Sequence, residues 1–587
     1  MNLLKSRLAA FLTIILTASV AFPQTTAKND PTRPVDKTAA PTKGAPASVD
    51  SIQGDMREAL GVIQQNYVGA KTLDYNEVFK DSMNGMLNTL DPHSKYFDAQ
   101  DNDEFKTEQT SQYYGIGAII GDLSDADGNV LATYIKATFE GAPAYKAGLR
   151  YGDKILSFSG QRAMPDGKLV EVKDESLLGK TFPEVRSYLR GPQGTAVKLT
   201  VQHLQTGKTE SVEIVRGAVP QPSISESYMI RPGIGYMAMS GGFNQTTYEE
   251  FANNLRTLKA AGMQQLILDL RGNGGGLVSQ AYRVASTFLG YGQTVFTQKG
   301  RADGVADQYP SSNRNPDKSP LVLLVDRNTA SASEILAGAL QDHDRALVVG
   351  ENTFGKGLVA YPFPLDYGSM VMLIIGKYET PSGRLIQRDY SNGLYNYYYE
   401  GGASGDDRPE YVRPKGAESK TDTGRSVYGG RGINPDIEIK YETLTPEQIR
   451  TQTKLLNPVF GFAMELVQGK VKGLETYKVN APIVFDYDIK ATDFPVNDTV
   501  MAAFKAYAAD KYQITGVQID REKDFVVRSL RTELITAAYG SQTSRQVFND
   551  YDPQLLKALS ALPQAKALAI EGEKARLNTA KLPSHAN

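Results

Sequence analysis

The sequence predicts a multidomain α/β protein in which a small β-rich domain precedes a larger α/β domain, with helical segments at both ends. The chain has 587 residues, more than one hydrophobic core usually organises. Residues 110–217 contain short apolar runs separated by glycine turns. Residues 218–441 alternate such runs with helical periodicity, which is typical of an α/β layer. Residues 49–109 and 442–587 carry mainly helical patterns.

The first 21 residues have the anatomy of a signal peptide. Lys5 and Arg7 supply positive charge, residues 8–20 are mostly apolar, and small residues precede a cleavage point after Ala21. The apolar stretch is short for a membrane span, and none is expected once the signal is removed. An uncleaved N-terminal anchor is the alternative. Residues 22–48 are rich in Pro, Thr, Ala and Lys, and we expect a disordered linker there. These features predict an exported protein of the periplasm or cell envelope.

The flanking segments are less informative. Residues 49–109 begin with apolar positions at helical spacing, among them Met56 and Leu60. Residues 390–432 are rich in Tyr, Gly and charge without periodicity, and we expect a surface loop. Residues 442–587 indicate a helical extension, to which the pattern assigns no role.

Charge and cysteine content exclude several classes of protein. Lys and Arg number 64 against 66 Asp and Glu, for a formal net charge of −2. This balance lacks the basic footprint of a nucleic-acid-binding protein. Cysteine is absent, which excludes disulfides, a cysteine nucleophile and a lipid-bearing cysteine. Metal motifs such as H-E-x-x-H are also absent, and we expect neither a metal nor another cofactor.

The β-rich domain has two glycine turns in a characteristic order. Tyr114, Gly115, Ile116 and Gly117 precede the first predicted strand, and the later turn contains Tyr151-Gly152-Asp153. Strands are expected at Gly117–Ile120, Leu131–Ile135, Lys154–Phe158 and Val197–His203, with helices at Ala142–Ala147 and Thr181–Leu189. This order resembles a PDZ domain, although Tyr151 replaces the usual proline. An unspecified β-barrel is the alternative.

The PDZ resemblance implies a peptide-binding function. In such domains a peptide adds to the sheet as an extra strand, and loop N–H groups hold its terminal carboxylate. Tyr114, Gly115, Ile116 and Gly117 are therefore the expected carboxylate-binding residues.

Two glycine-rich strings in the larger domain resemble nucleotide-binding loops but fail as such. Gly350–Lys356 spells G-x-x-x-x-G-K, yet Gly357 replaces the Ser or Thr that holds magnesium, and a strand-like run follows instead of a helix. Gly272–Gly276 lies between a strand and a helix, but Leu277 replaces the third glycine of a dinucleotide fingerprint. Glycines at a strand end can instead present N–H groups to an oxyanion.

The α/β domain places Ser331 and Lys356 at two successive strand ends. Strands are expected at Leu266–Leu270, Leu321–Val325 and Ala346–Val349, and helices at Val278–Leu289 and Ser333–Leu340. Ser331 opens a helix, and Lys356 lies on a glycine-flanked turn. Free lysine has a pKa of about 10.4, but burial beside Phe354 and Val359 would lower it and free the amine to act as a base. A helix-capping serine and a solvated lysine are the alternative.

Histidine is scarce, which bears on the identity of the base. The chain has His93, His203, His343 and His585. His343 ends the helix that Ser331 opens, roughly 18 Å away along its axis and beyond hydrogen-bond reach. His93 stays open as a base because contacts can be distant in the chain.

The ordered motifs from about residue 51 to residue 441 are similar to those of carboxyl-terminal processing peptidases, the tail-specific proteases. The matching strings are Leu90–Ser94, Leu266–Arg271 with the glycines that follow, Thr329–Gln341, Thr353–Gly357, Thr380–Arg384 and Gly432–Asp436. The resemblance implies that Ser331, rather than Ser333, is the nucleophile and that Lys356 is the base. It assigns Asp342 a supporting role.

We therefore expect an exported serine endopeptidase that cleaves near the C-termini of protein or peptide partners. The N–H groups of Ala332 and of Gly275 or Gly276 are the expected oxyanion hole. One departure stands out: the glutamine that the family commonly has four residues after the lysine is Ala360 here. A catalytically inactive PDZ-mediated binding protein of the cell envelope is the alternative. The sequence leaves open whether the protein forms an oligomer or uses an adaptor.

Overall fold

The structure is a computed structural model. It describes residues 48–163, 169–300, 307–391, 393, 395, 397–398, 418–441, 443–480 and 482–579. The expected signal peptide and nearly all of the expected linker lie outside these residues. Among the helices of these ranges, none combines the length and hydropathy that crossing a membrane requires. The chain divides into two compact units, residues 1–78 and 79–587.

The first unit is helical in its described part. It contains α1 (Val49–Asn66), the short 3-10 helix η1 (Ala70–Thr72) and the start of α2 (Tyr75–Leu87). Ser48 caps α1, because its Oγ accepts a hydrogen bond from the Ser51 N–H at 3.1 Å. α1 buries none of its residues.

The second unit begins with the rest of α2, followed by β1 (Lys95–Phe97), α3 (Ala99–Gln109) and a PDZ domain. Its antiparallel sheet has the order β3-β4-β5-β7-β8, with β6 beside β5. The strands are β3 (Ala118–Ser124), β4 (Val130–Thr138), β5 (Lys154–Ala163), β6 (Leu169–Ser176), β7 (Ala196–Gln202) and β8 (Thr209–Val215), with helices α4 (Pro143–Lys146) and α5 (Phe182–Leu189). β2 (Gln112–Gly115) and β9 (Gly217–Pro220) pair where the chain enters and leaves the domain.

The α/β core is a six-stranded sheet in the order β10-β11-β12-β15-β16-β21. The strands are β10 (Glu226–Arg231), β11 (Ile234–Ala238), β12 (Gln265–Asp269), β15 (Leu321–Val325), β16 (Leu347–Gly350) and β21 (Ile437–Glu438). β10 is antiparallel to β11, and the other pairs are parallel. β12, β15 and β16 therefore end at one edge of the sheet, where the candidate site lies.

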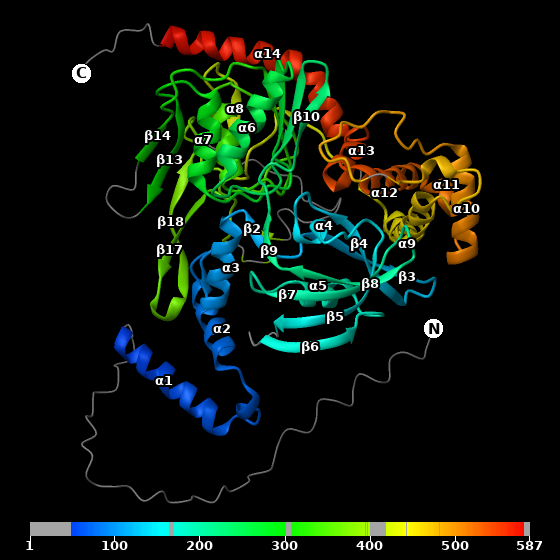
Figure 1. Ribbon diagram of the computed structural model, residues 1–587. Coiled ribbons are helices and arrows are strands. Elements are labelled where there is room, and N and C mark those ends of the chain that lie inside the picture. Colours follow the sequence, from blue (N-terminus) through cyan, green and yellow to red (C-terminus); the bar gives the residue numbers. More distant parts are fainter. Residues whose placement is uncertain are drawn as a thin grey trace, which may run out of the picture. The chain divides into compact units, whose positions relative to one another are not determined.

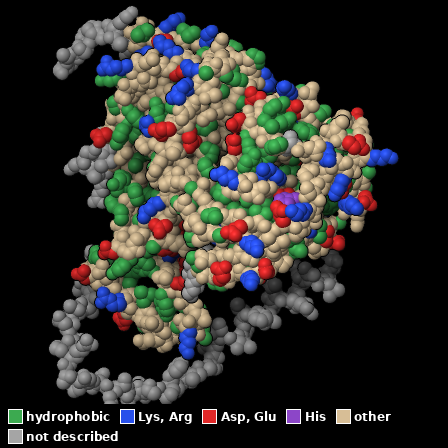
Figure 2. Space-filling view, in the orientation of Figure 1, with side chains coloured by type: hydrophobic (Ala, Val, Ile, Leu, Met, Phe, Trp, Pro, Cys, Tyr) green, Lys and Arg blue, Asp and Glu red, His purple; other side chains and the backbone are tan. Residues whose placement is uncertain are grey.

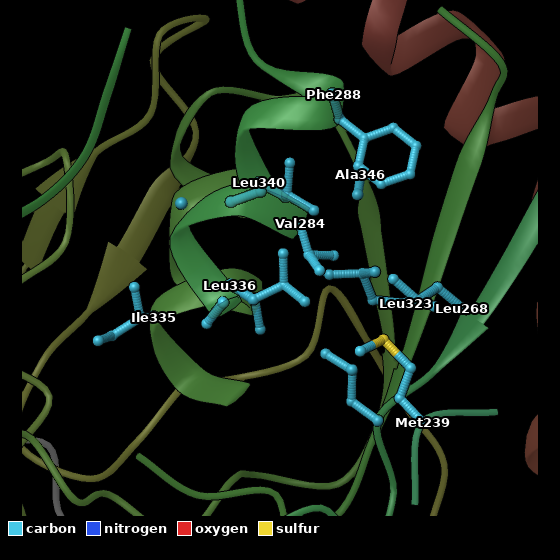
Figure 3. Packing of buried hydrophobic residues seen from close by; sticks show 14 of the residues in the cluster. Met239, Leu268, Val284, Phe288, Leu323, Ile335, Leu336, Leu340 and Ala346 are labelled. Atoms are coloured by element: carbon cyan, nitrogen blue, oxygen red, sulfur yellow. The ribbon is translucent and has the colours of Figure 1, made fainter. Parts of the chain in front are cut away.

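Three helices pack against one face of this sheet and form the largest core. They are α6 (Thr247–Ala260), α7 (Val278–Phe288) and α8 (Ala332–Asp342). Leu336 and Leu340 of α8 lie close to Leu323 on β15 and Val284 on α7, as Figure 3 shows. This packing fixes the start of α8 relative to the strand ends.

A second sheet carries the lysine turn. Its order is β1-β18-β13-β14, with β17 on the other edge of β18. The remaining strands are β13 (Thr294–Gly300), β14 (Asp307–Pro310), β17 (Leu358–Pro364) and β18 (Met370–Glu379), and the 3-10 helix η2 (Asp366–Gly368) joins the last two. The segment 390–432, expected to be an irregular loop, contains the hairpin of β19 (Glu418–Lys420) and β20 (Ser426–Tyr428). Its strands are too short to show a period in the sequence.

The C-terminal segment is helical and has two packing partners. It comprises α9 (Pro446–Gln468), the 3-10 helix η4 (Glu475–Tyr477), α10 (Asp498–Tyr512), α11 (Gly516–Arg521), α12 (Lys523–Ser544), α13 (Gln546–Asn549) and α14 (Pro553–Thr579). α9, α10 and α12 form a core that includes Leu123 and Tyr151 of the PDZ domain. α14 covers the second face of the six-stranded sheet, against Val322 and Leu324, and runs along the core in Figure 1.

The surface carries both signs of charge. On the face that Figure 2 shows, acidic and basic side chains are interspersed, in keeping with the formal net charge of −2.

The packing of α14 gives a stability prediction. Leu562 is 1% exposed against the six-stranded sheet, whereas Leu556 on the same helix is 44% exposed. Leu562→Ala removes buried apolar contacts and should destabilise the core by about 2–5 kcal/mol. Leu556→Ala should change it by less than about 0.5 kcal/mol. Urea unfolding measures both, and equal effects of the two substitutions would show that α14 is not part of the core.

Candidate active site

Ser331 sits at a strained turn at the start of α8. It is the N-cap residue, with φ 57° and ψ −117°, a backbone conformation that few residues with a side chain adopt. Its neighbours are fixed, because the Ala330 N–H donates to the Asn273 carbonyl at 3.0 Å and the Phe354 N–H donates to the Thr329 carbonyl at 2.9 Å. Ser331 therefore lies just outside the regular helix, in a backbone conformation that its neighbours hold in place.

Glu334 connects the serine to the lysine turn. Its side chain is 0% exposed. Its Oε2 accepts hydrogen bonds at 2.9 Å from the N–H groups of Ser331 and Lys356. Its Oε1 accepts from the Gly355 N–H at 2.7 Å and from Thr353 Oγ1. One carboxylate therefore fixes the backbones of both candidate catalytic residues.

Tyr378 makes a second connection between the same two residues. Its hydroxyl lies 2.9 Å from the Ser331 carbonyl oxygen and 2.7 Å from that of Lys356. The ring is 1% exposed, within the core beneath α8. The hydroxyl has one proton, which it donates to one of these carbonyls at a time or shares between them.

Lys356 lies in surroundings that favour its neutral form. Burial lowers the pKa of its amine, while the negative charges of Glu334 and Asp91 act in the opposite direction. No hydrogen bond joins Lys356 Nζ to Ser331 Oγ among the interactions of the described residues. Contacts of this kind are often long without substrate and tighten in the reacting complex.

The turn after Lys356 is held by a glutamine that lies elsewhere in the chain. Gln387 Oε1 accepts a hydrogen bond from the Gly357 N–H at 2.8 Å, and its Nε2 donates to the Arg388 carbonyl at 2.7 Å. Ala360, in the position of the family's usual glutamine, is exposed on β17. Gln387 therefore orders the lysine turn through its backbone rather than through the amine.

His93 lies near Lys356 but has little tendency to take a proton. Its Nε2 is 2.7 Å from the Tyr397 hydroxyl. Burial and the positive charge of Lys356 lower the pKa of His93 to about 3. His343 is engaged elsewhere, since its ring nitrogens contact Asp422 and the Thr294 carbonyl at 2.8 Å each.

The glycine loop after β12 lies directly against Ser331. A Cβ placed on Gly275 would come within 2.8 Å of Ser331 Cβ and 3.0 Å of the Ala332 nitrogen. The Gly275 N–H itself donates to Asn273 Oδ1 at 2.9 Å. The structure thus brings the glycines and Ala332 together, with the Gly275 N–H already satisfied within its own loop.

Residues 233–393 match peptidase family S41. The chain is 32% identical to carboxy-terminal processing protease CtpB of Bacillus subtilis, over 59% of this chain and 68% of that protein. It is 31% identical to the carboxy-terminal-processing protease of Bartonella bacilliformis, over 54% of this chain and 68% of that protein. The chain belongs to peptidase family S41. As a member of this family of carboxy-terminal processing proteases, it is a serine-type peptidase, which confirms the predicted resemblance.

Solved structures give weaker similarities. The photosystem II D1 C-terminal processing protease is 24% identical, covers 67% of this chain and 95% of its own, and has a TM-score of 0.33. The PDZ domain of a carboxy-terminal protease from Vibrio cholerae is 25% identical, covers 18% of this chain and 97% of its own, and has a TM-score of 0.14.

Asp342 lies at the far end of α8 in this S41 peptidase. It is 1% exposed, and its Oδ1 forms an ion pair with Arg384 at 2.7 Å. Its Oδ2 accepts a hydrogen bond from the Ser382 N–H at 3.0 Å. These contacts connect α8 to the turn that follows β18 and do not involve Ser331.

The predicted carboxylate-binding residues of the peptidase lie at the start of the PDZ sheet. Tyr114 and Gly115 end β2, and Ile116 is buried in the PDZ core. Gly117 has φ 73°, and a Cβ there would come within 2.4 Å of Ala142 Cβ. The loop therefore needs glycine to pass close to α4 before β3 begins.

Glu334, Tyr378 and Gln387 were not identified from the sequence. Glu334 stands three residues after Ser331, the spacing of a capping box, which was the available signal. Tyr378 and Gln387 contact the site from distant positions, and no local pattern marks them.

The position of Glu334 gives a catalytic prediction. Glu334→Gln keeps the shape of the side chain but replaces one acceptor oxygen with an NH2 group, so at least one of its N–H partners loses its hydrogen bond. We expect kcat to fall by roughly 10²-fold, because a small misplacement of reacting groups has effects of that size. The control Glu438→Gln, at a side chain that is 56% exposed on β21, should keep wild-type kcat. Full activity of a folded Glu334→Gln protein would contradict this role.

Proposed function

We propose that the protein is an exported serine endopeptidase that trims the C-terminal tails of other proteins with a Ser331/Lys356 dyad. The observation that carries the proposal is the buried Glu334 carboxylate, which bonds to the N–H groups of both residues. A lysine held in this way, with a lowered pKa, has the properties of a base that a serine nucleophile needs.

In the first half of the reaction, Ser331 Oγ attacks the scissile carbonyl carbon while its proton moves to neutral Lys356 Nζ. The ammonium then gives that proton to the departing amine, and the C-terminal fragment leaves. In the second half, Lys356 takes a proton from water as the water attacks the acyl-enzyme. Returning this proton to Ser331 Oγ releases the new C-terminus and restores the enzyme.

Negative charge on the carbonyl oxygen needs N–H donors in both halves. Ala332 is the first residue of α8, where N–H groups lack partners within the helix and the dipole favours negative charge. Gly276 is the better of the two glycine candidates, because the Gly275 N–H already donates to Asn273 Oδ1. Together the two N–H groups would stabilise the tetrahedral intermediate.

Tail recognition is assigned to the PDZ domain. β3 is an edge strand of its sheet, and α5 lies beside it. A tail can add to that edge while its terminal carboxylate meets the loop from Tyr114 to Gly117. Proteins named as carboxy-terminal processing proteases, such as the Bacillus subtilis relative, support this choice of substrate. Export rests on the signal-peptide pattern of the first 21 residues.

The dyad assignment predicts the behaviour of three variants. Ser331→Ala and Lys356→Ala should each abolish cleavage of an unstructured tail, because each removes a group that carries the reacting proton. His93→Ala should retain activity, because His93 is neutral and bonded to Tyr397. Cleavage followed by mass spectrometry measures all three. Substantial turnover by Lys356→Ala, or a loss in His93→Ala as complete as in Ser331→Ala, would refute the dyad.

Carboxylate recognition predicts a preference for peptides that end in a free C-terminal carboxylate. Amidating the C-terminus removes the charge that the loop from Tyr114 to Gly117 is expected to bind, so KM should rise while kcat changes little. The same peptide with a free acid is the matched control. Equal kcat/KM for the acid and the amide would exclude tail recognition. A folded protein that binds the acid peptide but never cleaves it would instead be a binding protein.

A further inference from the structure

The Glu533 carboxylate makes two contacts between the C-terminal helices and the PDZ domain. Glu533 of α12 forms an ion pair with Lys136 of β4 at 3.0 Å, and its other oxygen accepts a hydrogen bond from the Tyr151 hydroxyl at 2.8 Å. The side chains of Lys136 and Glu533 are only 24% and 20% exposed. Limited access to water strengthens such a pair and makes it costly to leave one partner unmatched.

Phe460 of α9 completes this contact. The Lys136 ammonium lies 3.1 Å from the centroid of its ring, and Tyr151 meets the ring edge-to-face with centroids 5.7 Å apart. Both geometries are attractive. Tyr151 stands where PDZ domains usually have proline, which has neither an aromatic ring nor a hydroxyl to donate. The departure from the family pattern therefore coincides with the contact to the helices.

Further hydrogen bonds join α9 to the same side of the PDZ domain. The Ser124 N–H, at the end of β3, donates to Asn457 Oδ1 at 3.1 Å. Gln205 Nε2 donates to the Val467 carbonyl at 3.2 Å, and Gln468 Nε2 donates to the Leu204 carbonyl. α9 thus meets β3 at the end opposite to the carboxylate-binding loop.

The C-terminal end of the helical segment contacts the six-stranded sheet that carries Ser331 at its edge. Asn549 of α13 donates to the Tyr228 hydroxyl on β10 at 2.7 Å. Asp552, just before α14, forms an ion pair at 2.6 Å with Arg271, which also pairs with Asp269 at the end of β12. Arg271 directly precedes the glycine loop that lies against Ser331. The helical segment from α9 to α14 therefore contacts the PDZ domain at one end and, through Arg271, the strand end before the glycine loop at the other.

We propose that this segment sets the distance between the captured carboxylate and the bond that Ser331 attacks, with Glu533 as the positioning residue. The inference rests on the proposed function, because it requires a tail held by the PDZ domain during cleavage. If the distance is set, the enzyme counts residues from the C-terminus. Removing the contacts of Glu533 should make the number of residues between the C-terminus and the cleaved bond variable, without affecting Ser331 or Lys356.

A tail of one repeated dipeptide tests this idea, because its bonds then differ only in their distance from the carboxylate. The full-length wild type should cut at a constant number of residues from the C-terminus when the repeat is lengthened, as read by mass spectrometry. Glu533→Ala should spread the cuts over a wider set of bonds. Asp524→Asn, at an exposed carboxylate of the same helix, is the control and should keep the wild-type position.

Two further readouts separate positioning from general damage. The kcat/KM for an amidated peptide should be unchanged in Glu533→Ala, since that reaction does not depend on the captured carboxylate. Hydrogen exchange should rise in β4 and stay unchanged in α8. The proposal that the helical segment sets the cleavage distance would be overturned by a fixed cleavage position in Glu533→Ala. It would also be overturned by a spread of cleavage positions in the wild type. A wild type that cuts no tail at all would refute the proposed function instead.

Discussion

A carboxylate without access to water needs a donor for each oxygen, and Glu334 finds its donors on two separate segments of the chain. Ser331 lies at the start of the same helix, whereas Thr353, Gly355 and Lys356 lie on the turn before β17. Burial raises the pKa of Glu334, and these hydrogen bonds counter that shift. Displacing either segment would leave a buried charge without its hydrogen bonds. The start of α8 and the turn before β17 are therefore held in fixed positions relative to each other.

The Glu334 carboxylate also acts electrostatically on the amine of Lys356. Burial favours the neutral amine of Lys356, but the negative charge of Glu334 favours the ammonium. In the proposed mechanism, this balance lets the lysine accept a proton from Ser331 and still return it to the leaving amine. Burial keeps the ring of His93 neutral, and the positive charge of Lys356, when that lysine is protonated, adds to the effect.

The sequence predicted the fold class because the apolar runs of the core are regular. Strands such as Leu321–Val325 and helices such as α8 follow from local periodicity, and the motif order identified the family. The roles of Ser331 and Lys356 stay predictions. Tyr378 and Gln387 could not be predicted because their contacts with the lysine turn depend on tertiary packing. The function of Tyr151 was equally hidden, since its partners Glu533 and Phe460 lie more than 300 residues away.

The pH dependence of kcat/KM for one acid-ended tail tests the central claim most directly. If neutral Lys356 is the base, kcat/KM should rise with pH and level off at an apparent pKa below the ordinary lysine value of about 10.4. His93, with a pKa of about 3, would already be neutral throughout the range from about pH 5 to 9. A profile that is flat across that range, with the enzyme folded, would contradict the account of Lys356 as the base.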